Sequence, residues 1–486
     1  MTHLLTIHPS GRQVSVPHGA NLLSALRDTG AAPDAPCGGA GTCGKCTVII
    51  DGIPLRACSV TVDRNMTVTI PEIGEMRILT AGLPVEHPLP NRNGYGLAFD
   101  IGTTTVAGAL LSPEGHVLRT ASARNPQASY GADVVSRIRA AMEGSMEALT
   151  AAIRNCLNKL LLELCQQANI SPTSIHLVSV VGNPAMQQLF LGILPENLAR
   201  PPFAPVLTRL EYGDAAPFFP CLSDARLLTA PDISGFVGAD TLGCMLAVGM
   251  DTTEEMTLLV DIGTNGEIVL GNRYRMVSCS TAAGPALEGA QIHFGMSARP
   301  GAIDRVSIEN GKFVCHVMGD IEARGICGSG IVSAVAAALE LGLLNSRGKI
   351  LNETKQIPLT QRIFLTQEDI RQVQLAKGAI AAGIRLLAKR MDLPLESISR
   401  VYLAGAFGTY LDPLAACRMG LLPQELTGKT IAIGNAALTG AQLLALDLPS
   451  CHRVSKMAVQ TQDLNLSTDP DFPRTFASCM RFDTTL

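Results

Sequence analysis

A cysteine-rich loop near the N-terminus holds the densest group of reactive side chains in the sequence. The stretch PCGGAGTCGKC, residues 36–46, contains Cys37, Cys43 and Cys46 among four glycines, and with Cys58 the spacing is C-x5-C-x2-C-x11-C. Four thiolates suit zinc or an iron–sulfur cluster. Zinc clasps usually pair two short C-x2-C hooks, whereas this loop has one. Glycines allow the curvature that turns backbone N–H groups toward a cluster. The loop favours an iron–sulfur cluster, with zinc or a redox thiol pair as alternatives.

The elements around the loop must position these cysteines. HLLTIH and RQVSVP predict two strands around the turn PSG, and NLLSALRDTG predicts a short helix with Asn21 as its N-cap. CTVII follows the loop as a strand, and VTVDRNMTVTIPE closes the unit. This order is typical of a β-grasp fold, and residues 1–80 resemble the [2Fe–2S] ferredoxin family. The resemblance implies that the cluster ligands are Cys37, Cys43, Cys46 and Cys58, although the x5 gap departs from the plant-type C-x4-C-x2-C spacing.

The tetrapeptide Asp-Ile-Gly-Thr occurs twice, starting at Asp100 and at Asp261. Each copy joins two apolar strand patterns, GLAFDIGTTTVAGALL and TLLVDIGTNGEIVLG. Glycine lets the backbone approach an anion, so that successive N–H groups and threonine hydroxyls can cradle a phosphate. An aspartate at a strand end can hold Mg²⁺ through water. Asp, Gly and Asn also build purely structural turns. Two copies in matching contexts nevertheless favour a duplicated fold with a phosphate site.

A third segment, VYLAGAFGTYLDP, predicts a strand that begins at Val401 and runs into four small or apolar residues. Small residues at a strand–helix junction let a nucleotide lie against the backbone. Helices are predicted for MEALTAAIRNCLNKLLLELCQQ, GSGIVSAVAAALELGLL and QVQLAKGAIAAGIRLLAKRM, so the class is α/β. Together these features resemble the superfamily of acetate and sugar kinases, Hsp70 chaperones and actin. Its members bind ATP and Mg²⁺ between duplicated RNase H-like halves.

The superfamily resemblance implies a set of nucleotide-site residues. Asp100 and Asp261 would orient Mg²⁺ and water, with turn-capping as the alternative. Glu267 would polarise the attacking water, with a solvated strand position as the alternative. Glu288 is interpreted as a solvated loop residue, with contact to ribose or a partner surface as the alternative. The nucleotide-binding residues would be Gly102, Thr103, Thr104 and Thr105 in the first turn, Gly263, Thr264, Asn265 and Gly266 in the second, and Gly405, Ala406, Phe407 and Gly408 in the adenosine segment.

Composition narrows the remaining choices. The chain has 486 residues, a formal net charge of −4 and no tryptophan, which argues against a nucleic-acid-binding protein. Neither a signal peptide nor a stretch long enough to span a membrane is evident, so a cytoplasmic location is expected. The length predicts several domains. We expect a ferredoxin-like domain over residues 1–80, a linker over 81–94, and two ATPase subdomains over 95–250 and 251–486.

A [2Fe–2S] ferredoxin joined to this ATPase fold resembles the reductive activators of corrinoid proteins. The phrases NPQASYGADVVSRI, GNPAMQQLFLG, GADTLG, AAGPALEGAQI, ARGICGSGIV and FPRTFASCMRF also fit that family. Its larger members have an additional domain between the ferredoxin and the ATPase. Only the short linker fills that place here, so the chain is expected to be a short form that lacks the middle domain.

The family resemblance implies an anaerobic, ATP-hydrolysing iron–sulfur reductase. One electron would pass from the cluster to a corrinoid protein of a methyltransferase system and convert Co(II) to Co(I). An upstream low-potential donor and a homodimer formed through the ATPase part are implied as well. Two other functions remain open: a redox-regulated kinase of a small molecule, and a chaperone-like factor that assembles a cofactor.

Overall fold

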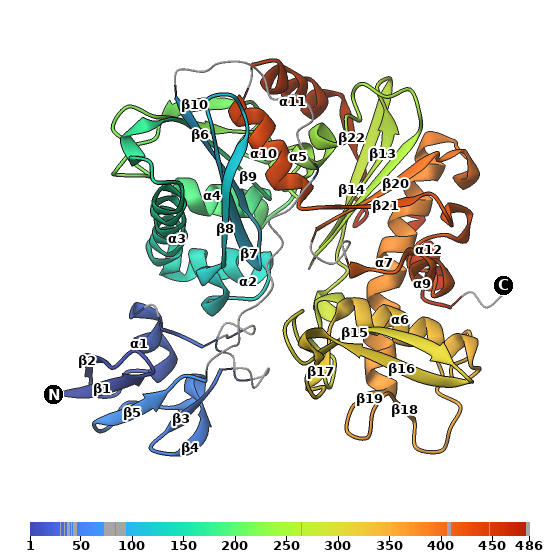
Figure 1. Ribbon diagram of the computed structural model, residues 1–486, viewed down its shortest axis with the longest axis horizontal. Coiled ribbons are helices and arrows are strands. Elements are labelled where there is room, and N and C mark those ends of the chain that lie inside the picture. Colours follow the sequence, from blue (N-terminus) through green and yellow to red (C-terminus); the bar gives the residue numbers. More distant parts are fainter. Residues whose placement is uncertain are drawn as a thin grey trace.

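The computed structural model describes residues 1–71 except 30, 34, 36–38, 40 and 42–45, residue 83, and residues 94–482 except 264, 406–409 and 447. Figure 1 shows a small N-terminal domain in blue, a first lobe in cyan and green, and a second lobe in yellow and orange. No helix in these described ranges is long and apolar enough to cross a membrane.

The N-terminal domain is a five-stranded sheet in the order β2-β1-β5-β3-β4. The first and last strands in the chain, β1 and β5, lie side by side inside the sheet and pair in parallel, as the crossover of a β-grasp requires, and one short helix covers the sheet. Asn21 caps this helix by accepting a hydrogen bond from the Ser24 N–H at 3.3 Å, as predicted. The elements are β1 (Thr2–His8), β2 (Arg12–Pro17), α1 (Leu22–Asp28), β3 (Thr47–Ile50), β4 (Ile53–Arg56), the 3₁₀ turn η1 (Ala57–Ser59) and β5 (Met66–Thr69).

Each lobe is built on a six-stranded sheet, and the two sheets share one plan. In each sheet, the first three strands in the chain pair antiparallel with one another. Two later strands extend the sheet on the other side of the first strand, and both pair in parallel. The first sheet has β10-β11-β9-β6-β7-β8, formed by β6 (Tyr95–Ile101), β7 (Thr105–Leu111), β8 (Val117–Arg124), β9 (Ile175–Gly182), β10 (Glu211–Asp214) and β11 (Arg226–Thr229). The second has β21-β20-β12-β13-β14-β22, formed by β12 (Thr257–Ile262), β13 (Gly266–Asn272), β14 (Arg275–Thr281), β20 (Arg400–Ala404), β21 (Thr430–Gly434) and β22 (Thr461–Asp463). The predicted duplicated α/β fold is confirmed.

Long helices cover the outer face of each sheet. The helix α3 (Met146–Ala168) packs on β7 and β8, and α7 (Gln367–Met391) packs on β13 and β14. Both were predicted, but α7 starts before the apolar pattern begins, because Thr366 and Asp369 form a capping box. The shorter helices are α2 (Val134–Ala140), α4 (Pro184–Leu191), α9 (Pro413–Arg418), α11 (Leu448–Gln460) and α12 (Phe472–Cys479).

Two helices, α5 (Ala239–Ala247) and α10 (Ala436–Leu446), fill the space between the sheets (Figure 1). Their side chains share one apolar core with residues of β6, β9, β12 and β13. The helices meet at Gly243 and Gly440, where a Cβ atom built on Gly440 would lie 2.2 Å from the Gly243 Cα. Helix α10 therefore joins the lobes, although it belongs to the C-terminal part of the sequence.

This close approach predicts a large effect of one methyl group. Gly440→Ala forces α5 and α10 apart, and we expect it to destabilise the protein by about 1–3 kcal/mol, as overpacking does elsewhere. The matched control is Gly213→Ala, because a Cβ built on Gly213 meets no atom within 4 Å. Thermal unfolding of the two variants measures the difference, and equal melting temperatures would contradict the packing described.

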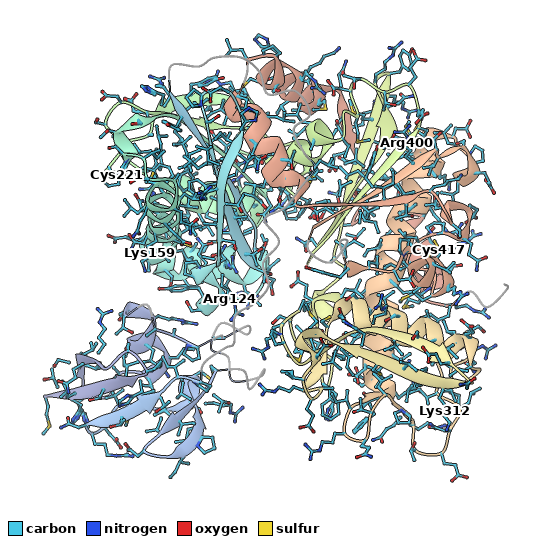
Figure 2. The ribbon with its side chains drawn as sticks, viewed as in Figure 1. Arg124, Lys159, Cys221, Lys312, Arg400 and Cys417 are labelled. Carbon is cyan, nitrogen blue, oxygen red and sulfur yellow. The ribbon has the colours of Figure 1, made fainter. Side chains whose placement is uncertain are left out.

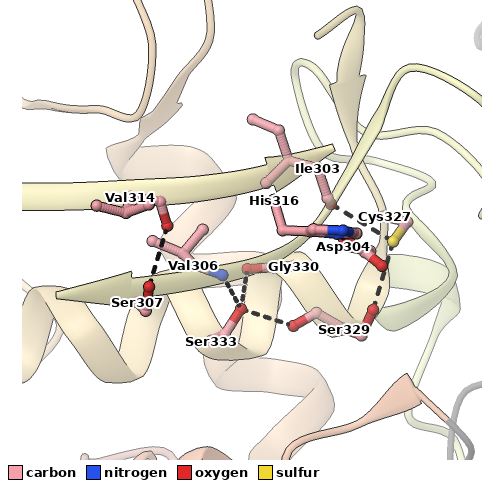
Figure 3. Close-up of polar contacts among 10 residues, drawn as sticks. All are labelled: Ile303, Asp304, Val306, Ser307, Val314, His316, Cys327, Ser329, Gly330 and Ser333. Carbon is pink, nitrogen blue, oxygen red and sulfur yellow. Dashed lines mark hydrogen bonds and ion pairs between the residues drawn. The ribbon is translucent and has the colours of Figure 1, made fainter. Parts of the chain in front are cut away.

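A smaller layer extends the second lobe and is shown in Figure 3. Its strands β15 (Ala302–Glu309), β16 (Lys312–Val317) and β17 (Gly325–Ile326) lie on α6 (Gly328–Glu340). The Ser333 hydroxyl on α6 accepts a hydrogen bond from the Val306 N–H at 2.9 Å, which ties the helix to the sheet. Asp304 pairs with His316 on the neighbouring strand, with 2.5 Å between Oδ1 and Nδ1. A two-stranded hairpin follows, formed by β18 (Gln356–Pro358) and β19 (Phe364–Thr366).

Candidate functional site

The first Asp-Ile-Gly-Thr turn joins β6 to β7 and is fixed by its carbonyl groups. The Asn125 side chain donates to the Gly102 carbonyl at 2.8 Å, and the Asn125 N–H donates to the Thr104 carbonyl at 2.9 Å. The buried Arg137 guanidinium donates to the Thr103 carbonyl at 2.6 Å. Since three successive carbonyls point to this one side, the turn is held in a single conformation. A phosphate cradle at such a turn would need its backbone N–H groups to face the anion.

The second turn joins β12 to β13 in the same way. Asp261 stands opposite Glu267 in the strand register, and the Gly263 N–H donates to the Asn265 carbonyl at 2.9 Å. The Ser280 hydroxyl donates to the Glu267 carboxylate at 3.2 Å. Thr264 lies outside the described residues. Both predicted turns are therefore hairpin turns at equivalent strand ends of the two sheets.

Glu288 links the two turns. Its carboxylate accepts a hydrogen bond from the Thr104 hydroxyl at 3.4 Å, and a Cβ built on Gly263 would lie 3.7 Å from it. The residue ends a 3₁₀ turn, η6 (Pro285–Glu288), and is half-buried. The interpretation of Glu288 as a solvated loop residue is wrong. The contact between Glu288 and Thr104 could not be predicted, because the two residues are far apart in the sequence.

A group of half-buried carboxylates lies at the ends of the central strands. Desolvation raises the pKa of Asp100 to about 7, and repulsion from Asp240 adds to this shift. Desolvation and Asp240 likewise raise the pKa of Asp261 to about 7. The pKa of Glu267 is raised well above its ordinary value for the same two reasons. Such clustered acids with raised pKa values are typical of functional sites, because they bind a cation or exchange a proton.

Asp240 was not singled out from the sequence. It lies in the first turn of α5, where it accepts a hydrogen bond from the Thr241 N–H at 2.7 Å, and its own pKa is raised to about 6, chiefly by desolvation. The phrase GADTLG contained the signal, because Gly238 permits a close approach. A Cβ on Gly238 would lie 2.7 Å from the Gly182 carbonyl oxygen at the end of β9. Only glycine fits at position 238, and this close contact places Asp240 beside the other carboxylates.

The C-terminal half contributes two further residues. Asn435 caps α10 and donates to the Asp100 carboxylate at 3.0 Å, so it joins the two lobes at the site. Gly405 has φ +82°, and a Cβ there would lie 2.7 Å from the Asp261 carboxylate. The end of β20 therefore lies directly beside the second turn. Ala406, Phe407 and Gly408 lie outside the described residues.

The carboxylate group predicts how stability depends on pH. The folded-state pKa values of Asp100 and Asp261, about 7, exceed their ordinary value of 3.8. The stabilisation linked to protonation is therefore full below pH 3.8 and is lost as pH rises to 7. We expect the nucleotide-free protein to melt at progressively lower temperature as the pH rises from about 5 to about 8. Asp240→Asn should lessen this loss in thermal unfolding, whereas Asp304→Asn, outside the group, should leave it unchanged.

The described part of the cysteine loop fits a cluster. Cys46 is buried at the start of β3, and Cys58 is half-buried in η1, at the matching end of the β3–β4 hairpin. Gly39 has φ +102°, and a Cβ there would lie 3.9 Å from the Cys58 Cβ, so glycine leaves room beside this thiol. Cys37 and Cys43 lie outside the described residues. Within the described ranges, no group of three His, Cys, Asp or Glu side chains could hold a metal.

Three family models match the chain in sequence order. Residues 3–72 match a 2Fe-2S iron-sulfur cluster binding domain, residues 95–253 match the RACo middle region, and residues 255–485 match the C-terminal domain of RACo, the ASKHA domain. The expectation that the middle domain is missing is therefore wrong. The matched stretch folds as the first lobe, for which the first Asp-Ile-Gly-Thr strand pair predicts an ATPase subdomain.

Individual proteins match over most of the chain. "Corrinoid activation enzyme RamQ" of Eubacterium limosum is 36% identical over 414 residues, 79% of this chain and 69% of that protein. "[Co(II) methylated amine-specific corrinoid protein] reductase" of Methanosarcina barkeri is 28% identical over 417 residues, 78% of this chain and 75% of that protein. The solved structure "Reductive activator for corrinoid,iron-sulfur protein" has a TM-score of 0.72 and 28% identity, and covers 99% of this chain and 98% of its own.

Proposed function

Because the chain belongs to the family of corrinoid activation enzymes, we propose that it is an ATP-dependent reductase that converts the inactive Co(II) corrinoid of a methyl-transfer protein to Co(I). One observation carries the proposal: a 2Fe-2S cluster-binding domain is joined, in one chain, to a duplicated fold with two equivalent phosphate turns. The first part suits transfer of single electrons, and the second suits use of ATP.

Different residues of the chain would bind the cluster and the nucleotide. Cys37, Cys43, Cys46 and Cys58 would hold the cluster, which supplies one electron when bound. The described pair fits that role, because Cys46 and Cys58 lie at matching ends of one hairpin beside a glycine.

The nucleotide would bind at the two turns. The carbonyls of the first turn are already engaged by Asn125 and Arg137, so its N–H groups would be the groups that bind a phosphate. Asp100 and Asp261 would hold Mg²⁺ through water, since Mg²⁺ usually keeps several waters and binds one or two carboxylates plus phosphates. Glu267 would orient the water that attacks the terminal phosphate.

ATP can act on the reduction only by favouring one conformation over another. We propose that nucleotide binding or hydrolysis draws the two lobes together against the corrinoid protein and alters the axial ligation of cobalt, which makes cobalt easier to reduce. Asn435 and Glu288 connect the lobes at the site, so a change caused there by nucleotide would reach both lobes. The reduction balances as Co(II) plus one electron to Co(I), and ATP is hydrolysed to ADP and phosphate.

The remaining assignments are proposals as well. We place the units at residues 1–80, 81–94, 95–250 and 251–486, with a cytoplasmic location. An upstream low-potential donor would reload the cluster, and two copies would pair through the ATPase part. No nucleic acid or membrane partner is proposed.

The test is an optical assay of Co(II)-to-Co(I) conversion. A candidate corrinoid protein is mixed anaerobically with the protein and a low-potential reductant, with and without ATP. We expect Co(I) to accumulate faster with ATP. Equal rates would reject the coupling, and phosphoryl transfer to an added small acceptor would favour the kinase alternative.

A further inference from the structure

Arg27 connects the cluster-bearing domain to the first lobe. Arg27 lies in the last turn of α1, and its Nε atom donates to the Ser129 carbonyl at 2.7 Å, with Nη2 donating to the same oxygen. Its guanidinium carbon lies 5.0 Å from the centre of the Tyr130 ring, within the range of a cation–π contact. The two partners belong to the turn η2 (Pro126–Ser129) and the residue after it. Figure 1 shows α1 on the side of the blue domain that faces this lobe.

On the other side, Arg27 lies beside the cysteine loop. A Cβ built on Gly39 would lie 3.9 Å from the Arg27 Nη2 atom and 3.9 Å from the Cys58 Cβ. The guanidinium therefore bridges the edge of the proposed cluster site and the first lobe. Arginine suits this position because its rigid, planar fork stays charged and stacks on aromatic rings.

The segment that accepts Arg27 is the same one that holds the first phosphate turn. Asn125 begins η2 and bonds to the backbone of Gly102 and Thr104, as described above. Gln127, fully buried, donates to the Leu149 carbonyl at 3.0 Å. Residues 125–131 are thus fixed to the lobe on one face and bind the other domain with the opposite face. We call them the docking segment.

Arg137 reinforces this link. It is fully buried, donates to the Gly131 carbonyl at 2.9 Å and reaches the Thr103 carbonyl at 2.6 Å. One side chain therefore holds both the end of the docking segment and the centre of the phosphate turn. Because Arg137 holds both, a change in the conformation of one segment requires the other to adjust.

We propose that the docking segment is the surface on which the cluster-bearing domain settles through Arg27, and that nucleotide at the first turn strengthens this docking. The sign follows from the contacts. Asn125 and Arg137, which also fix the docking segment, hold the three carbonyls of residues 102–104 on one side of the turn, so docking and phosphate binding would favour the same turn conformation. Linkage is reciprocal, so docking must raise the affinity for nucleotide by the same factor. The inference rests on the proposed function in that ATP binds at this turn.

Arg27→Ala tests the coupling. We expect it to weaken binding of a non-hydrolysable ATP analogue about fivefold, the lower end of usual allosteric couplings. Arg27→Lys keeps the charge but loses the fork, and should give a smaller loss. Tyr130→Leu removes the ring from the other side of the contact and should act in the same direction. The matched control is Arg64→Ala, because Arg64 pairs with Asp51 on the N-terminal domain at a side-chain exposure of 61%.

Hydrogen exchange separates this inference from the proposed function. In the unchanged protein, the analogue should slow amide exchange in residues 22–29 as well as around residues 102–106. In Arg27→Ala, only the protection around 102–106 should remain. Protection at the turn without any change at residues 22–29 in the unchanged protein would overturn the coupling and leave the proposed function standing. An analogue that protects neither region would reject the ATP site itself. Melting temperature and iron content identify any variant that fails to fold.

Discussion

Asp261→Asn is expected to lower the ATP-dependent rate of Co(I) formation by about 100-fold or more, the effect usual for loss of one positioned electrostatic contact at a reacting phosphate. Asp261 lies one residue before the end of β12, within the group of carboxylates, where desolvation and Asp240 raise its pKa to about 7. Loss of its negative charge removes the attraction for Mg²⁺ but changes the shape of the side chain little. The protein should therefore fold and keep its cluster.

The measurement is the rate of Co(I) formation at saturating ATP, together with phosphate release. Asp304→Asn is the matched control, because Asp304 is also largely buried and hydrogen-bonded but lies in the β15–β16 layer (Figure 3). An Asp261→Asn protein with the normal rate would remove this residue from the nucleotide site. A loss in both variants would indicate a general effect of aspartate replacement.

Cys58→Ser should reduce electron transfer to the level seen without the protein. Cys58 is half-buried beside Gly39 and is the proposed fourth cluster ligand. A serine hydroxyl is a poor replacement for a thiolate, since iron–sulfur clusters are held by Cys thiolates. We expect lost or weakened visible absorption and a lower iron content, while ATP hydrolysis by the two lobes continues.

Cys221→Ser is the control for this variant. Cys221 is half-buried on the outer side of the first lobe, away from the N-terminal domain (Figure 2). Its replacement should leave absorption and reduction unchanged. Corrinoid activation that persists in Cys58→Ser would favour an assembly factor over a reductase.

The parts of the site that could be predicted are those encoded by short segments. Asp100, Asp261 and their glycines were found because a strand, a tight turn and a second strand form one local unit. The cysteine spacing is local as well. The β-grasp order and the duplication followed from such units, and the fold agrees with them.

The parts that were missed depend on contacts between distant segments. Asn435 reaches Asp100 only because α10 packs on the first sheet, and Asp240 reaches it only because Gly238 fits against the Gly182 carbonyl. Glu288 meets Thr104 across the two lobes. Strand periodicity and residue spacing contain no information about such pairs, because each pair is set by the packing of whole elements. The same limit hid the contact between Arg27 and Ser129.

The central claim is that ATP controls the delivery of one electron from the N-terminal domain. A single-turnover experiment tests it most directly. The protein is reduced anaerobically, freed of excess reductant and mixed with a Co(II) corrinoid protein, while cobalt and cluster absorption are followed together. With ATP, we predict that cluster oxidation and Co(I) formation proceed at the same rate and in equal amounts. Without ATP, both should be slow. Equal conversion with and without ATP, or Co(I) formation without cluster oxidation, would contradict the account.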